Sequence, residues 1–219
     1  MSKILCSTCV IFVTTLMVTS ACANTTLIEE KPAMPQKPLS PATVPSVYVQ
    51  THSRVVTVDS TSAVLTRYSR KDGRNANLRG EHFSMVVSNN GVLKGFANMS
   101  LDLVDLPLPS RERAEQIARA FLQEKAPDLL KRMKISWIAP HDETLVITQD
   151  GGQERVTLTG MKVKMHNLAD GLWFWVIVGG DEKPMVFERD IAWITFPGKR
   201  QTEKWLHDGW LIEHPPTVE

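Results

Sequence analysis

One short segment places a histidine beside two carboxylates, the side chains that most often bind metals or transfer protons. The segment His141–Glu143 (HDE) follows a proline and precedes an apolar stretch. An imidazole next to two carboxylates can bind a divalent cation or act in general acid and base catalysis. Clustered polar residues between periodic segments are usually loops, in which adjacent side chains point in different directions. We therefore expect a solvated turn between two strands here, with catalysis as the alternative.

Four tryptophans are candidates for contact with a ligand or for docking of the C-terminus. Trp205 and Trp210 enclose the pair His207–Asp208, an arrangement that could form an aromatic clamp with a polar handle. We favour docking, in which the C-terminus packs by burying two large rings that each need a partner for the indole N–H. Trp173 and Trp175 alternate with a phenylalanine, so a strand here would give one side to the core and the other to a binding surface.

The sequence contains no other motif for catalysis, a metal or a cofactor. A G-x-S-x-G elbow, an H-E-x-x-H helix, a P-loop and a G-x-G-x-x-G turn are all absent from it. The histidines are dispersed without a recognised ligand spacing, at His52, His82, His141, His166, His207 and His214. We therefore expect neither an enzyme nor a metal or cofactor site.

The first residues have the pattern of a bacterial export signal. Lys3 provides a short positive start, and Ile4–Val18 is an apolar run too short for the roughly 20 residues of a membrane-spanning helix. Cys6 and Cys9 form a C-x-x-C spacing, which can indicate a redox motif, but they lie inside this run. We interpret them as part of a signal that is removed.

Two cleavage sites compete around Cys22. The segment Val18–Cys22 (VTSAC) resembles the lipobox of bacterial lipoproteins, which implies a signal peptide over 1–21 and acylation of Cys22 as the first mature residue. The alternative is an ordinary A-x-A site at Ala21–Ala23, which releases a soluble chain beginning at Asn24. We favour lipidation because it accounts for the thiol, which has no other mature cysteine to pair with.

Residues 22–45 are expected to form a flexible tether. From position 32 to 45 a proline recurs at every third or fourth residue and large apolar side chains are scarce, so this segment is extended and semi-rigid. A tether suits a lipid-anchored protein. Ala23 replaces the aspartate that typically retains such lipoproteins at the inner membrane, so we expect the outer membrane, facing the periplasm. A soluble periplasmic protein is the alternative.

The charge balance excludes some partners. The 25 Lys and Arg residues and 24 Asp and Glu residues give a net charge of +1, and they are intermixed along the chain. Nucleic-acid binding normally needs a basic patch or stripe, so we expect no nucleic acid as partner. Attachment to a membrane would depend on the lipid at Cys22.

The remaining residues, 46–219, are predicted to form a single α+β domain. Alternating and β-branched residues predict strands over 46–58 and 61–68, and Asn89–Gly91 predicts the turn of a hairpin. Ser110 is a suitable N-cap for a helix that ends near Ala126, and its apolar residues form one stripe. Short strands fill the second half. We expect antiparallel β-sheet meanders with one main amphipathic helix packed on a sheet face.

The hairpin and helix together resemble a known family. HFSMVVSNNGVLKGFANMS followed by SRERAEQIARAFLQEKAP, within residues 81–126, is similar to the PepSY-like modules of exported bacterial proteins. That resemblance implies a non-catalytic interaction or protease-modulating module. We therefore expect a cell-envelope protein that binds another envelope protein or a cell-wall component. The alternatives are a soluble periplasmic enzyme with a His and carboxylate site, and a structural subunit of an envelope assembly.

Overall fold

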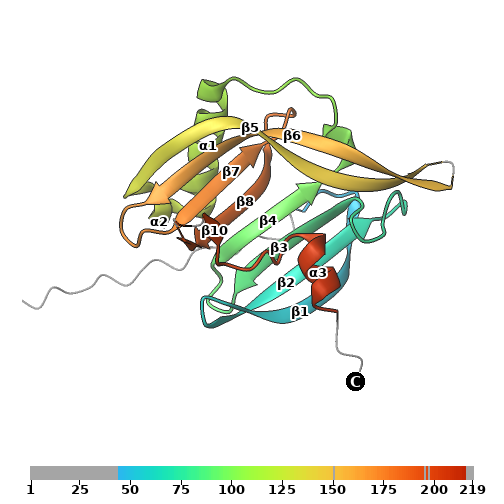
Figure 1. Ribbon diagram of the computed structural model, residues 1–219, viewed down its shortest axis with the longest axis horizontal. Coiled ribbons are helices and arrows are strands. Elements are labelled where there is room, and N and C mark those ends of the chain that lie inside the picture. Colours follow the sequence, from blue (N-terminus) through green and yellow to red (C-terminus); the bar gives the residue numbers. More distant parts are fainter. Residues whose placement is uncertain (1–43, 150, 195, 197, 216–219) are drawn as a thin grey trace, which may run out of the picture. The chain divides into compact units, whose positions relative to one another are not determined.

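The computed structural model of the protein describes residues 44–149, 151–194, 196 and 198–215 (Figure 1). The predicted signal peptide over 1–21, the lipidation site Cys22 and nearly all of the tether over 22–45 lie outside the described residues. Their assignment therefore stays a prediction.

The described chain forms a sheet of eight antiparallel strands in the order β1-β2-β3-β4-β8-β7-β6-β5. Two meanders, β1 to β4 and β5 to β8, lie side by side because β4 pairs with β8, with Gly95 opposite Glu188. A separate two-stranded hairpin, β9 and β10, follows. The strands are β1 (Tyr48–Val58), β2 (Thr61–Arg70), β3 (His82–Ser88), β4 (Leu93–Met99), β5 (Met133–Gln149), β6 (Gly152–Asn167), β7 (Trp173–Val178), β8 (Pro184–Ile191), β9 (Trp193–Ile194) and β10 (Lys199–Arg200).

The helices are short and occupy a small share of the structure. They are the 3-10 helix η2 (Leu101–Leu103), α1 (Arg111–Lys125), α2 (Pro127–Leu130) and α3 (Asp208–Glu213). Strand accounts for 51% of the structure and helix for 17%, so the predicted α+β class with one main amphipathic helix is wrong. The protein is mostly antiparallel β-sheet.

The predicted turn at His141–Glu143 is also wrong, because this segment lies in the middle of the continuous 17-residue strand β5. Pro140 has no N–H to donate, but β5 stands at the edge of the sheet, where proline is tolerated. Gly160 lies inside the long strand β6, which continues through it without a break. A Cβ there would lie 2.5 Å from Cγ2 of Ile177, so glycine permits the close approach of β7.

The predicted helix start is confirmed in detail. The Ser110 hydroxyl accepts a hydrogen bond from the backbone N–H of Arg113 at 3.1 Å, which satisfies a free donor of the first turn of α1. Ala114, Ala118 and Leu122 are its buried residues. They pack against β5 to β8 and contribute to the core on this side of the sheet, which we call the helix face.

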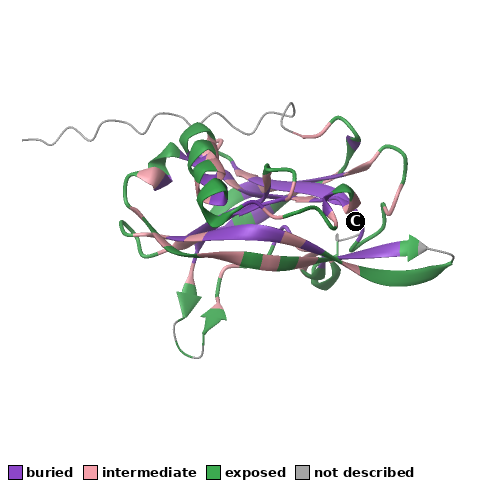
Figure 2. Ribbon diagram, turned by 90° about the horizontal axis from the view of Figure 1, so that it is seen from above, coloured by how far each residue is buried: buried purple, intermediate pink, exposed green. Residues whose placement is uncertain are grey.

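The opposite side, which we call the C-terminal face, carries a second apolar cluster. Trp175 of β7, Val186 of β8 and Leu145 of β5 meet Trp205 and Leu206 from the C-terminal segment there. Figure 2 shows α1 on one side of the sheet, while the β9–β10 hairpin projects from the other. The C-terminal segment therefore packs on the face that α1 leaves uncovered.

Candidate functional site

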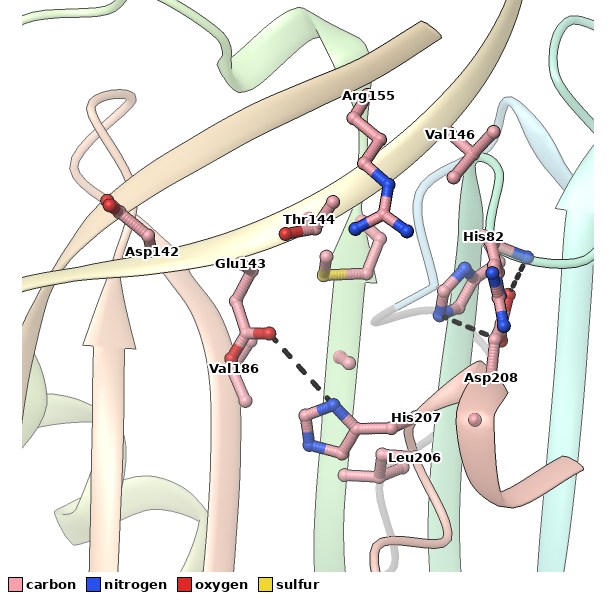
Figure 3. Close-up of a pocket in the computed structure, with 14 residues that line it drawn as sticks. His82, Asp142, Glu143, Thr144, Val146, Arg155, Val186, Leu206, His207 and Asp208 are labelled. Atoms are coloured by element: carbon pink, nitrogen blue, oxygen red, sulfur yellow. Dashed lines mark hydrogen bonds and ion pairs between the residues drawn. The ribbon is translucent and has the colours of Figure 1, made fainter. Parts of the chain in front are cut away.

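Two adjoining cavities lie on the C-terminal face, and both are lined by Glu143 of β5 and by His207. The first, which we call the His82 cavity, has a volume of about 400 Å³ (Figure 3). The second, which we call the Lys162 cavity, has a volume of about 470 Å³. Volumes of this size suit small ligands or single groups of a larger one.

Curling of the long β5–β6 hairpin forms the His82 cavity. The backbone N–H of Val146 in β5 donates to the carbonyl of Arg79, in the loop before β3, at 2.7 Å. This contact brings the edge strand β5 next to the start of β3, although the two strands stand far apart in the sheet order. The cavity wall then comes from the loop before β3, from β3, β4, β5, β6 and β8, and from the residues around α3.

His82 lies in the wall of this cavity with one ring nitrogen unpaired. Its Nδ1 lies 2.8 Å from the carbonyl of Gly80, and since a carbonyl only accepts, Nδ1 carries the proton. Nε2 is then a bare acceptor, buried and without a hydrogen-bond partner among the described residues. Burial, and then the charge of Arg67, lower the pKa of His82 to about 4, so the ring is neutral at neutral pH.

Asp208, the first residue of α3, is held by a buried ion pair. Both terminal nitrogens of Arg67 in β2 donate to its carboxylate, one of them at 2.9 Å, and the backbone N–H of Arg79 donates as well. Burial acts to raise the pKa of Asp208, but the neighbouring His82 and Arg67 lower it below the ordinary value. This carboxylate is therefore ionised and fully occupied by its partners.

Glu143 lies between His141 and His207, two histidines that are far apart in the sequence. One of its oxygens lies 3.5 Å from Nε2 of His141, and the other lies 4.0 Å from Nδ1 of His207, toward which Figure 3 shows it pointing. Burial raises the pKa of Glu143, while the hydrogen bond from His141 and the charge of His207 lower it to a net value below the usual range. Glu143 is therefore the carboxylate shared by both cavities.

Lys162 of β6 is the most unusual group in the second cavity. Its side chain is 8% exposed, and Nζ lies 4.1 Å from the ring centroid of Trp175. Burial lowers the pKa of Lys162 to about 8. The neighbouring carboxylate of Glu188 is occupied by Arg200, whose two terminal nitrogens donate to it at 3.1 and 2.7 Å.

Of the predicted aromatic residues, Trp175 lines the Lys162 cavity and is buried. Trp173 lies nearby, stacked on His166, and its ring centroid is 4.5 Å from Nζ of Lys164. That same ammonium also contacts Trp193 and Trp137 at 4.9 and 5.8 Å, so it sits among three indole rings.

The two C-terminal tryptophans lie outside both cavities. Trp205 is buried, and its N–H has no partner among the residues that the structure describes. The N–H of Trp210 donates to Glu203 at 2.6 Å, and its ring lies 4.3 Å from the guanidinium of Arg54 on β1. Contact of these rings with a ligand stays a prediction.

Sequence analysis did not find His82, Lys162 or Glu188 as site residues. Lys162 alternates with apolar residues, a pattern typical of the exposed side of a half-buried strand, yet it is buried. One signal was present: Glu188–Asp190 places three charged residues in succession within the apolar strand β8, and all three are buried. Charges inside a central strand need partners, so they mark where other elements must converge.

Within the described ranges, no group of three His, Cys, Asp or Glu side chains is arranged to hold a metal ion, and no helix is long and apolar enough to cross a membrane. Nothing in the described cavities points positively to catalysis. The chain matches no protein-family model, no curated protein and no solved structure.

Proposed function

We propose that this chain is an exported cell-envelope binding module without catalytic activity, attached to the outer membrane through Cys22 and facing the periplasm. Its cavities on the C-terminal face bind a group of another envelope component. The observation that carries this proposal is the bare Nε2 of His82, a buried acceptor in a cavity wall.

An unpaired buried polar group costs stability, by about 1 to 3 kcal/mol. A ligand with an N–H or O–H group that reaches Nε2 of His82 would recover that cost as binding energy. The carboxylate of Asp208 lies 3.9 Å from the same nitrogen, but it accepts from Arg67 and from the N–H of Arg79 and has no proton to donate to Nε2. At Nε2 the cavity wall is therefore complementary to a donor.

Three titratable groups that line the His82 cavity are unsuited to proton transfer at neutral pH, which favours binding there. Glu143 and Asp208 have lowered pKa values and His82 is neutral, so none of the three is poised to exchange a proton near neutral pH. The resemblance of residues 81–126 to PepSY-like interaction modules supports the same proposal, as do the export signal and the tether.

The test is co-sedimentation of the full-length chain with purified cell-wall sacculi and, separately, with outer-membrane vesicles. Every chain in this test, including the one called wild type, carries Cys22→Ser, so that no lipid inserts into the vesicles. Thr144 is exposed and lines the His82 cavity, so Thr144→Trp should block it and reduce binding to whichever fraction the wild type binds. Thr148→Trp is the matched control, because Thr148 is an exposed threonine of the same strand that lines neither cavity. Absence of wild-type binding to both fractions, or equal loss in both variants, would refute the proposal.

A further inference from the structure

The charges lining the Lys162 cavity are out of balance. Both of its carboxylates have partners, since Glu143 lies between two imidazoles and Glu188 takes both terminal nitrogens of Arg200. Three lysines line the same cavity, and in the described part of the chain none of them makes a hydrogen bond or an ion pair: Lys162, Lys199 and Lys204. The unmatched charge in this cavity is therefore positive.

The three lysines differ in how far they are buried. Lys199 and Lys204 are exposed, and water solvates their ammonium groups, whereas Lys162 is 8% exposed. The Trp175 ring provides an attractive surface for the Lys162 ammonium, but a π face offers no oxygen to accept its hydrogen bonds. Glu188 and Glu143 act on this ammonium by charge, but neither forms an ion pair with it, so Lys162 lacks the direct anionic partner that a buried ammonium normally has.

We infer that the Lys162 cavity is an anion-binding site, in which the Lys162 ammonium at the base and Lys199 and Lys204 at the rim receive a carboxylate or phosphate of the ligand. The inference rests on the proposed function only in assigning that anion to an envelope component. A carboxylated cell-wall sugar and a phosphorylated headgroup share this chemistry.

The adjoining His82 cavity makes the two ends of the combined site chemically different. It presents the acceptor Nε2 of His82, while the Lys162 cavity presents donors, and Glu143 and His207 line both. A ligand that fills both cavities would carry an anionic group at one end and a hydroxyl, amine or amide N–H at the other. Anionic sugars have this combination of groups.

The first experiment is calorimetric titration of the full chain with sulfate, whose charge is constant between pH 6 and 9. We expect saturable binding at pH 7. Lys162→Met should weaken it about tenfold, as expected for loss of one charge-assisted hydrogen bond, and Lys204→Ala should weaken it less. Lys71→Met is the control, because Lys71 is exposed and lies outside the cavity. Because Lys204 is exposed, its variant tests the inference even if Lys162→Met disturbs folding.

The pH dependence provides an independent measurement. Sulfate affinity of the wild type should fall as the pH rises through about 8, where Lys162 loses its proton, and that of Lys162→Met should change much less. Absence of sulfate binding, or equal affinity in the wild type, Lys162→Met and Lys204→Ala, would overturn the inference.

A second titration identifies the source of the anion. N-acetylmuramic acid presents a carboxylate, glucose 1-phosphate a phosphate and N-acetylglucosamine no charge. Tighter binding of either anionic sugar supports the inference and names the group, while equal binding of the neutral sugar contradicts it. If sulfate binds through Lys162 but the chain binds neither sacculi nor vesicles, the anion site stands and the proposed function fails. If co-sedimentation depends on Thr144 and sulfate does not bind, the proposed function stands and the anion site fails.

Discussion

Acidification should lower the free energy of unfolding of this protein, because His82 binds a proton more readily in the unfolded chain. In the folded chain the ring is buried against Arg67, Asp208 and His207, and its pKa is about 4 against an ordinary value of 6.5. Between these two values the unfolded chain binds a proton at His82 that the folded chain does not. Stability is therefore complete above pH 6.5 and is lost as the pH falls toward 4.

The magnitude follows from the two pKa values. A tenfold change in proton affinity corresponds to about 1.4 kcal/mol, so a fall of the pKa from 6.5 to about 4 makes His82 responsible for about 3 kcal/mol of stability. That is a large part of the roughly 5 to 15 kcal/mol that stabilises a typical domain. Carboxylates with lowered pKa values, such as Asp208 and Glu143, add further losses at lower pH.

The assay is urea unfolding of the wild type and of His82→Gln at pH 7, 6, 5 and 4.5. Glutamine does not titrate, and its amide can still donate to the carbonyl of Gly80. The free energy of unfolding of the wild type should therefore fall more steeply than that of the variant, and the difference isolates His82. Parallel curves, or an NMR titration that places the pKa of His82 near 6.5, would refute the reasoning.

Three other predictions concern single residues. Burial lowers the pKa of Lys162 from 10.5 to about 8, so the unfolding free energy of the wild type should rise between pH 8 and 10 while that of Lys162→Met stays level; a rise in both would contradict it. Gly160→Ala should cost about 1 to 3 kcal/mol in urea unfolding, because its Cβ would meet Ile177 and the carbonyl of Val178, and an unchanged midpoint would argue against this packing. Cys22→Ser should move the protein from membranes to the soluble periplasm in a Gram-negative host; a wild-type intact mass beginning at Asn24 without lipid would disprove lipidation.

Elements determined by neighbouring residues could be predicted from the sequence. The start of α1 needed only Ser110 and the apolar stripe that follows it. The β3–β4 hairpin was predicted from Asn89–Gly91, and Gly91 indeed has a positive φ of 81°. In both cases the decisive contacts lie within a few residues along the chain, so local chemistry was sufficient.

The fold class could not be predicted because it depends on long-range pairing. Pro140 and Gly160 resemble ends of strands, and the sequence does not reveal that one lies at a sheet edge and the other beneath Ile177. If strands are ended at these residues, β5 and β6 are replaced by several short strands. The share of strand in the fold is then underestimated and the share of helix is overestimated.

The candidate site was partly predicted as separate segments. His141–Glu143 and His207–Asp208 were both singled out, and the structure brings the first segment to His207 through Glu143. The pairing of Arg67 with Asp208 spans 141 residues, and nothing in the spacing of either segment reveals it. His82 and Lys162 could not be recognised, because their burial depends on the C-terminal segment.

This dependence links the stability of the C-terminal segment to the site. His207 precedes Asp208 directly, and Asp208 is attached to β2 through Arg67 and to the loop before β3 through the N–H of Arg79. Loss of either charged side chain would leave the other buried without its partner, which typically costs about 3 to 5 kcal/mol. The same loss would remove the anchor next to His207, which lines both cavities. The buried ion pair therefore positions the binding groups as well as the chain end, and a variant at Arg67 or Asp208 cannot separate folding from binding.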